Sequence, residues 1–138
     1  MKSYALASTL ALVIGWIAAI LFHSIFSISV YGSLRGGDLG VVTFWSFVFM
    51  MLANGFFIQL PQSAISQFCR RTSRSNFILT SILYALACFT ILIGWLWIQA
   101  IYNDNNRSFG IVVYSQAAII GLGFGFFFPR LWKYATPS

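Results

Sequence analysis

The sequence contains no glutamate, and its only acidic residues are Asp38 and Asp104. It has a single histidine, His23, and two cysteines that form neither a CxxC nor a Cys/His pattern. These shortages leave no paired carboxylates, no His pair for a metal or haem, and no Ser/His/Asp set of the usual catalytic kind. We therefore expect no enzyme activity, no cofactor and no bound metal.

Charge of either sign is also scarce. Only 7% of the 138 residues are charged, against roughly 25% in an ordinary soluble domain, while 59% are hydrophobic. A soluble fold of this length could not hide so much apolar surface from water. The net charge is +6, but the basic residues lie between apolar runs, so they indicate membrane orientation and not a nucleic-acid partner. The bilayer itself is the expected surroundings.

Four apolar segments are long enough to cross the bilayer, because a helix needs roughly 20 residues to span roughly 30 Å of hydrocarbon. They cover residues 4–28, 39–60, 77–101 and 110–128, and none contains Lys, Arg, Asp or Glu. Pro61 and Pro129 lie where the second and fourth segments should end. The sequence predicts an all-α membrane protein: one domain of four transmembrane helices in two consecutive hairpins, joined by a loop over residues 61–76.

The basic residues are divided unequally between the two ends of these segments. Arg35 and Arg107 belong to the outer turns, whereas the end with both termini and the loop carries Lys2, Arg70, Arg71, Arg74, Arg130 and Lys133. The positive-inside rule therefore predicts that both termini and the loop are cytoplasmic, most simply in a bacterial inner membrane.

Aromatic residues are expected at the two membrane interfaces. We place Trp16 deeper, inside the bundle; the interfacial set is Trp45, Trp95, Trp97 and Tyr102 on the outer side and Tyr4, Trp132 and Tyr134 on the inner side.

The loop contains one amphipathic stretch. Within residues 62–71, Ile65, Phe68 and Cys69 follow helical spacing, and Arg70 and Arg71 stand at the polar end. A short helix on the membrane surface and a solvated loop are both compatible with this pattern.

The two halves of the chain also share a short motif. Gly55-Phe56-Phe57 and Gly125-Phe126-Phe127 each precede a proline and then basic residues. A parallel duplication of the hairpin would explain the match, and so would chance, because apolar segments match easily.

Small residues recur at four-residue spacing in the first and fourth segments. The first has Ala7, Ala11, Gly15 and Ala19, and the fourth has Ala117, Gly121 and Gly125. Such stripes allow close approach of membrane helices. They favour packing of the first helix on the fourth, or alternatively contact with another subunit. The second and third segments carry bulky aromatic residues suited to lipid or to a large apolar partner.

Polar residues inside the predicted spans are functional candidates, because they are costly in hydrocarbon. The main ones are Asn54, Gln99, Gln116 and His23. Asn54 is the deepest, and an interhelical hydrogen bond is its simplest role. Gln99 and Gln116 could face one another, and His23 could titrate near neutral pH or bond to a carbonyl.

The basic residues Arg70, Arg71, Arg74, Arg130 and Lys133 form a rim that would attract anionic lipid head groups at about 1 kcal/mol per residue. Two functions compete on these observations. The first is a small non-catalytic accessory subunit, assembly factor or inhibitor that packs against another membrane protein or against itself. The second is a small oligomeric transporter or flippase of a lipid-linked or amphiphilic substrate.

The second hypothesis agrees with a local resemblance. The stretch Arg130-Leu131-Trp132-Lys133-Tyr134 after the fourth span resembles GtrA-like proteins, which have four spans. The resemblance covers these residues only, and it implies movement of lipid-linked sugars.

Overall fold

A computed structural model describes the backbone of residues 2–33, 36–102 and 107–135, and the side chains of residues 4–33, 39–91 and 112–132. Over these residues the chain is helical, with helices α1 (Lys2–Tyr31), α2 (Gly36–Ala53), η1 (Asn54–Gln59), α3 (Gln62–Arg71), α4 (Arg74–Tyr102) and α5 (Arg107–Ala135). Four helical stretches are long and apolar enough to cross a membrane: Tyr4–Tyr31, Leu39–Gln59, Arg74–Ile91 and Val112–Trp132. The predicted all-α fold with four membrane-spanning helices is confirmed.

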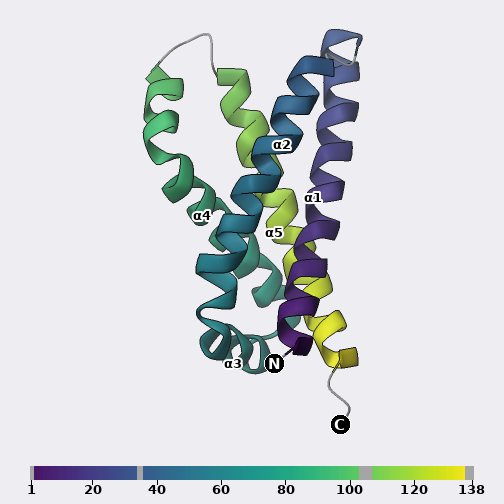
Figure 1. The fold of residues 1–138 in the computed structure, drawn as a ribbon, viewed down its shortest axis with the longest axis vertical. Helices are drawn as coiled ribbons and strands as arrows, with labels where there is room; N and C mark the ends of the chain where they lie inside the picture. Colours follow the sequence, from purple (N-terminus) through teal and green to yellow (C-terminus); the bar gives the residue numbers. More distant parts are fainter. Residues whose placement is uncertain (1, 34–35, 103–106, 136–138) are drawn as a thin grey trace.

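The long helices run antiparallel to their neighbours in the chain, and α5 lies between α1 and α4 (Figure 1). The two most extensive interfaces are α1 with α5 and α4 with α5, whereas α2 has far fewer contacts with α1 and α4. Helix α3 lies across one end of the bundle, beside the first residues of α1 and the last of α5 (Figure 1). The chain therefore gathers most of its basic residues at the α3 end.

Two helix ends show how local sequence determines the fold. Helix α1 ends before Gly32, which has a φ of +69° and whose N–H donates to Ile28 O at 2.9 Å. This is the left-handed glycine cap that commonly ends helices. At the end of η1, Pro61 has no N–H, so the helical bond pattern stops there as predicted.

The prediction that Pro129 ends the fourth helix is wrong, because α5 continues to Ala135. Membrane helices tolerate proline where neighbouring groups hold the chain in place. Here Phe128 and Trp132 stack at 5.7 Å between ring centroids, and Tyr4 of α1 packs edge-on against Phe128 at 5.4 Å. These aromatic contacts hold the final turns of α5 against α1.

The α1–α5 interface is built on a contact between two glycines. A Cβ added to Gly123 would lie 2.5 Å from Gly15 Cα, and one added to Gly15 would lie 2.9 Å from Ile120 O. Because no side chain fits between the backbones, the helices approach closely and gain dispersion energy along their length. Ala7, Ala11 and Ala19 of the same α1 face are buried.

Gly121 and Gly125 of α5 face a different helix. A Cβ on Gly121 would lie 2.7 Å from Ile82 Cα, and one on Gly125 would lie 2.8 Å from Ile78 Cα, both in α4. The α5 stripe is therefore not packed on α1 as a whole: Gly121 and Gly125 belong to the α4 interface, and Gly123 on the opposite face belongs to α1. Ala117 is fully buried.

The matching Gly-Phe-Phe motifs occupy different structures. Gly55 lies in the π-helical segment η1, where an added Cβ would meet nothing within 4 Å, whereas Gly125 lies in a continuous α-helix against α4. The two motifs therefore share sequence but not local packing.

Candidate functional site

A connected set of polar side chains joins α1 to η1. Gln59 Nε2 donates to Ser8 Oγ at 2.7 Å and to Asn54 Oδ1 at 3.2 Å. Asn54 Nδ2 in turn donates to Thr9 Oγ1 at 3.2 Å, and Ser8 and Asn54 are buried. An unsatisfied amide in hydrocarbon is costly, so these bonds fix η1 against the N-terminal half of α1.

Two tyrosines satisfy carbonyls at the end of η1. The i→i+5 bond from Leu60 N to Gly55 O marks the π-helical segment, and Pro61 then removes a donor from the next turn. The Tyr4 hydroxyl of α1 donates to Ile58 O at 2.9 Å, and the Tyr84 hydroxyl of α4 donates to Phe57 O. Three segments distant in sequence thus share the backbone bonds that the helix end lacks.

An apolar groove opens between α3 and α4 beside this helix end. Its volume is about 390 Å³, within the roughly 300–1,000 Å³ of small-molecule sites. Its walls are apolar apart from two hydroxyl groups and the tyrosine. The lining residues are Pro61, Ala64, Ile65, Phe68, Phe77, Thr80, Ser81, Tyr84 and Phe124.

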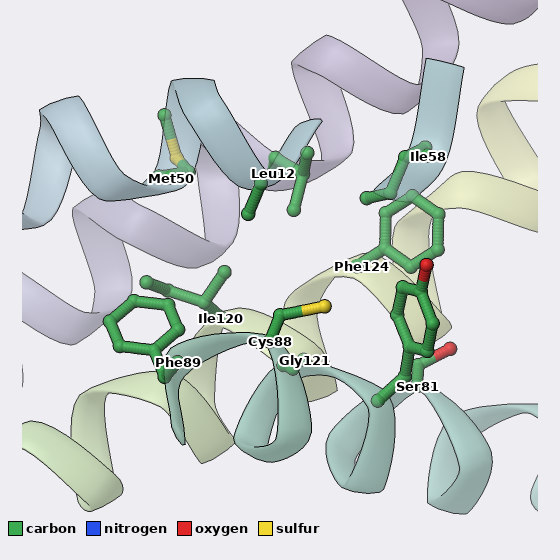
Figure 2. A pocket seen from close by; sticks show the side chains of 12 residues that line it. Leu12, Met50, Ile58, Ser81, Cys88, Phe89, Ile120, Gly121 and Phe124 are labelled. Carbon is green, nitrogen blue, oxygen red and sulfur yellow. The ribbon is translucent and has the colours of Figure 1, made fainter. Parts of the chain in front are cut away.

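A second, smaller cavity lies deeper, between α1, α2, η1, α4 and α5. Its volume of about 30 Å³ is close to that of one water molecule, and its walls are almost entirely apolar. In Figure 2, Leu12 of α1 and Ile58 of η1 form one wall, and Cys88 and Phe89 of α4 form the opposite wall. Ser81, Tyr84 and Phe124 line both spaces, so the groove and the inner cavity are adjacent.

Two arginines lie close in sequence to rings that line the groove. On α3, Arg71 follows Phe68 by three residues, and on α4, Arg74 precedes Phe77 by three, so each arginine lies on the helix face of a groove-lining ring. Both arginines are exposed. Arg74 also begins α4, where its charge meets the positive end of the helix dipole.

Two of the cations share one aromatic ring. Arg130 Cζ lies 3.6 Å and Arg74 Cζ 5.6 Å from the ring centroid of Phe126, and Arg70 Cζ lies 5.0 Å from that of Trp132. The described side chains include no Asp or Glu, so within the described part of the chain no carboxylate balances these charges. The arrangement suits an anion, because guanidinium groups form paired hydrogen bonds with phosphate or carboxylate.

Cys69 of α3 directly precedes Arg70 in the chain and is half-buried against the core. Burial raises the pKa of its thiol above 9.0, and the neighbouring Arg70 lowers it in part. The thiol is therefore protonated, and weakly reactive, at neutral pH.

The remaining predicted site residues lie toward the other end. Gln116 is buried, and its Nε2 has no hydrogen-bond partner among the described residues. His23 lines a small cavity of about 70 Å³ with Phe22, Phe26 and residues of α5. The side chains of Gln99 and Lys133 lie outside the described residues, and so does the predicted pairing of Gln99 with Gln116.

The structure also corrects the expectation for Tyr4 and decides between the two alternatives for residues 62–71. Tyr4 is 2% exposed and bonded inside the bundle, so it is not an interfacial aromatic residue of the belt. The stretch 62–71 is a helix and not a solvated loop: Ile65 and Cys69 pack against the core while Phe68 is partly exposed. Trp16 packs inside as predicted, donating from Nε1 to Ser46 Oγ at 2.9 Å.

Sequence reasoning missed the residues that act through three-dimensional proximity. Tyr84 is one of several bulky aromatic residues of the third segment, and Ser8 and Thr9 belong to no motif. Their hydroxyl groups are common in membrane helices, so no local pattern distinguishes them. Pro61 was the available signal, since a proline-terminated helix leaves carbonyls that need other donors.

No family model matches the sequence, and neither the curated proteins nor the solved structures contain a match to it. The local resemblance to GtrA-like proteins therefore has no support from these comparisons, and any function must be argued from the residues themselves.

Proposed function

We propose that this protein binds an anionic amphiphile, with the apolar chain in the groove between α3 and α4 and the head group at the arginines beside it. The observation that supports this most is a combination on α3 and α4. The two helices line an apolar groove of about 390 Å³, and the exposed Arg71 and Arg74 each lie three residues from a ring that lines it. The described side chains include no carboxylate to balance these charges. On this proposal, the protein is a small transporter or carrier of a lipid-linked or amphiphilic substrate.

The head group supplies most of the selectivity in this proposal. A chain that leaves bilayer hydrocarbon for an apolar groove gains little from the hydrophobic effect, because both surroundings are apolar. Attraction of a phosphate to each nearby basic residue is worth about 1 kcal/mol. Arg71, Arg74 and Arg130 could together favour a phosphate head group over a zwitterionic one by about 2–3 kcal/mol.

The competing hypothesis is an accessory or inhibitory subunit that packs against a partner. Its support is the aromatic surface of α2 and η1, where Phe44 and Trp45 of α2 and Phe56 of η1 are each more than half exposed. Lipid covers such a face equally well. The glycines that could have served a partner are instead used between α1, α4 and α5.

The α3 end is proposed to face the cytoplasm of a bacterial cell, because short loops at that side are enriched in Lys and Arg. Single cysteines placed at Ser73 and Asn105 in a cysteine-free variant test this orientation. An impermeant thiol reagent added to intact cells should label only the Asn105 position. Labelling of the Ser73 position alone would reverse the orientation.

The binding proposal is tested by native mass spectrometry of the protein released from nanodiscs that contain equal amounts of phosphatidic acid and phosphatidylcholine. We expect phosphatidic acid to be retained in excess. The double variant Arg74→Gln/Arg130→Gln should lower that excess by at least tenfold, which corresponds to about 1.4 kcal/mol.

The control is Arg107→Gln, which removes one positive charge at the opposite end of α5. It should leave the excess unchanged. Equal retention of the two lipids by the wild type, or an equal loss in the control, would contradict the proposal. Copurification of a stoichiometric second protein without lipid would favour the accessory subunit.

A further inference from the structure

Tyr84 stands where the groove meets the inner cavity. It lines both spaces, and its ring packs edge-on against Phe57 of η1 at 6.2 Å between centroids. Its hydroxyl donates to the carbonyl of the same residue. The side chain therefore bridges α4 and η1 across the line along which a chain in the groove would have to advance.

The Phe57 carbonyl has no ready substitute for the Tyr84 hydroxyl. The preceding helix end lacks donors because Pro61 has no N–H, and the surrounding walls are apolar. Moving Tyr84 aside would leave the Phe57 carbonyl without a donor in a medium without water, which is strongly unfavourable. An apolar chain offers no hydrogen bond in exchange.

The space behind Tyr84 can accept more than it now holds. The inner cavity has room for about one water molecule, yet the α2–α4 contact that closes it is among the thinnest in the bundle. On the α4 side, the wall of this cavity includes Cys88 and Phe89 (Figure 2). A small outward movement of α4 would join the two spaces.

We propose that Tyr84 is the specificity-determining residue of the groove: through its bond to the Phe57 carbonyl it stops the apolar chain of the bound amphiphile at the entrance of the inner cavity. The proposal rests on the proposed binding of an anionic amphiphile in this groove. It implies a ligand class with a chain of limited length, or with a bend or branch at the depth of Tyr84. Longer straight chains must leave the groove toward the bilayer.

The chain offers a matched pair of variants. Tyr84→Phe removes the hydroxyl at the groove, and Tyr4→Phe removes the equivalent hydroxyl on the next carbonyl, that of Ile58. Tyr4 lines neither the groove nor the inner cavity. Both variants leave one η1 carbonyl without its donor, but Tyr4 is 2% exposed and Tyr84 is 37% exposed, so the stability of each variant is measured alongside.

The experiment uses long-chain alkyl phosphates that carry a diazirine either near the phosphate or at the chain end, bound to the protein in phosphatidylcholine nanodiscs. After irradiation, the cross-linked residues are mapped by mass spectrometry. In the wild type and in Tyr4→Phe, the chain-end probe should label the groove and lipid-facing residues and spare residues 85–89. In Tyr84→Phe, labelling of residues 85–89 should rise severalfold.

The two probes separate the possible failures. If the probe near the phosphate does not label the groove, the proposed function fails and this inference with it. If that probe labels the groove but the chain-end probe labels residues 85–89 equally in all three proteins, binding stands and the role of Tyr84 is refuted. The same refutation follows if Tyr4→Phe and Tyr84→Phe open the cavity equally.

Discussion

Replacing Gly123 by alanine tests the central contact of the bundle. The new Cβ would lie 2.5 Å from Gly15 Cα, whereas carbon atoms pack at about 3.5–4.0 Å, so α1 and α5 must separate by about 1–1.5 Å at their crossing. The contact is backbone against backbone, so no flexible side chain can yield. Overpacking of this kind costs about 1–3 kcal/mol.

The same substitution also raises helix propensity, which for Gly→Ala contributes about 1 kcal/mol. From the upper part of the overpacking range, the expected net loss in the free energy of unfolding is about 2 kcal/mol. Gly40→Ala provides the matched control, because a Cβ at that exposed helical position meets nothing within 4 Å. This control should be neutral or up to about 1 kcal/mol more stable.

The assay is reversible unfolding of each variant in mixed micelles of mild detergent and dodecyl sulfate, followed by circular dichroism. We expect the free energy of unfolding to fall in Gly123→Ala and not to fall in Gly40→Ala. A Gly123→Ala protein as stable as Gly40→Ala would mean that α1 and α5 do not meet backbone to backbone at this position, and the arrangement around α5 would be refuted.

Asn54→Ala should lower the free energy of unfolding by about 1–2 kcal/mol, because it removes the hydrogen bonds to Thr9 and Gln59. The control Ser29→Ala removes an exposed hydrogen bond within α1 and should change the free energy of unfolding little. Equal effects of the two variants would contradict the network. Tyr4→Phe should cost about 1–3 kcal/mol in the same assay because the Ile58 carbonyl loses its donor, and a neutral result would refute that bond. Because the pKa of Cys69 is raised above 9.0, its alkylation, followed on its own peptide by mass spectrometry, should be slower than that of free cysteine and increase as the pH rises above 9.0. Because the folded-state pKa of the Cys69 thiol is above its unfolded value, its contribution to the free energy of unfolding is complete below pH 9.0 and is lost as the pH rises through the folded pKa. Cys69→Ser should remove this contribution to the pH dependence of stability. An unchanged pH dependence would contradict the burial of the thiol.

The spans could be predicted from sequence because hydropathy and length alone determine which segments cross a bilayer. The fourth helix shows where this reasoning ends. Pro129 is a helix breaker in water, but the aromatic contacts of Phe128 and Trp132 keep α5 helical through it. Those contacts involve Tyr4 from the other end of the chain, which no local rule detects.

Small-residue spacing likewise identified close packing but not its partners. A four-residue repeat selects Gly121 and Gly125 and omits Gly123, which lies on the opposite face and makes the closest contact with α1. The groove was further from reach. It depends on α3 folding as a helix, on where Pro61 ends η1, and on Tyr84 reaching across from α4. Only the basic residues at its edge could be recognised from the sequence alone.

Competition for the groove tests the account most directly. The wild-type protein in phosphatidylcholine nanodiscs is cross-linked with an alkyl phosphate that carries a diazirine near the phosphate, in the presence of unlabelled competitors of identical chain length. The account predicts labelling of the α3 and α4 residues of the groove that excess alkyl phosphate suppresses and excess alkylphosphocholine does not. Equal suppression by both competitors, or labelling spread evenly around the four helices, would contradict it.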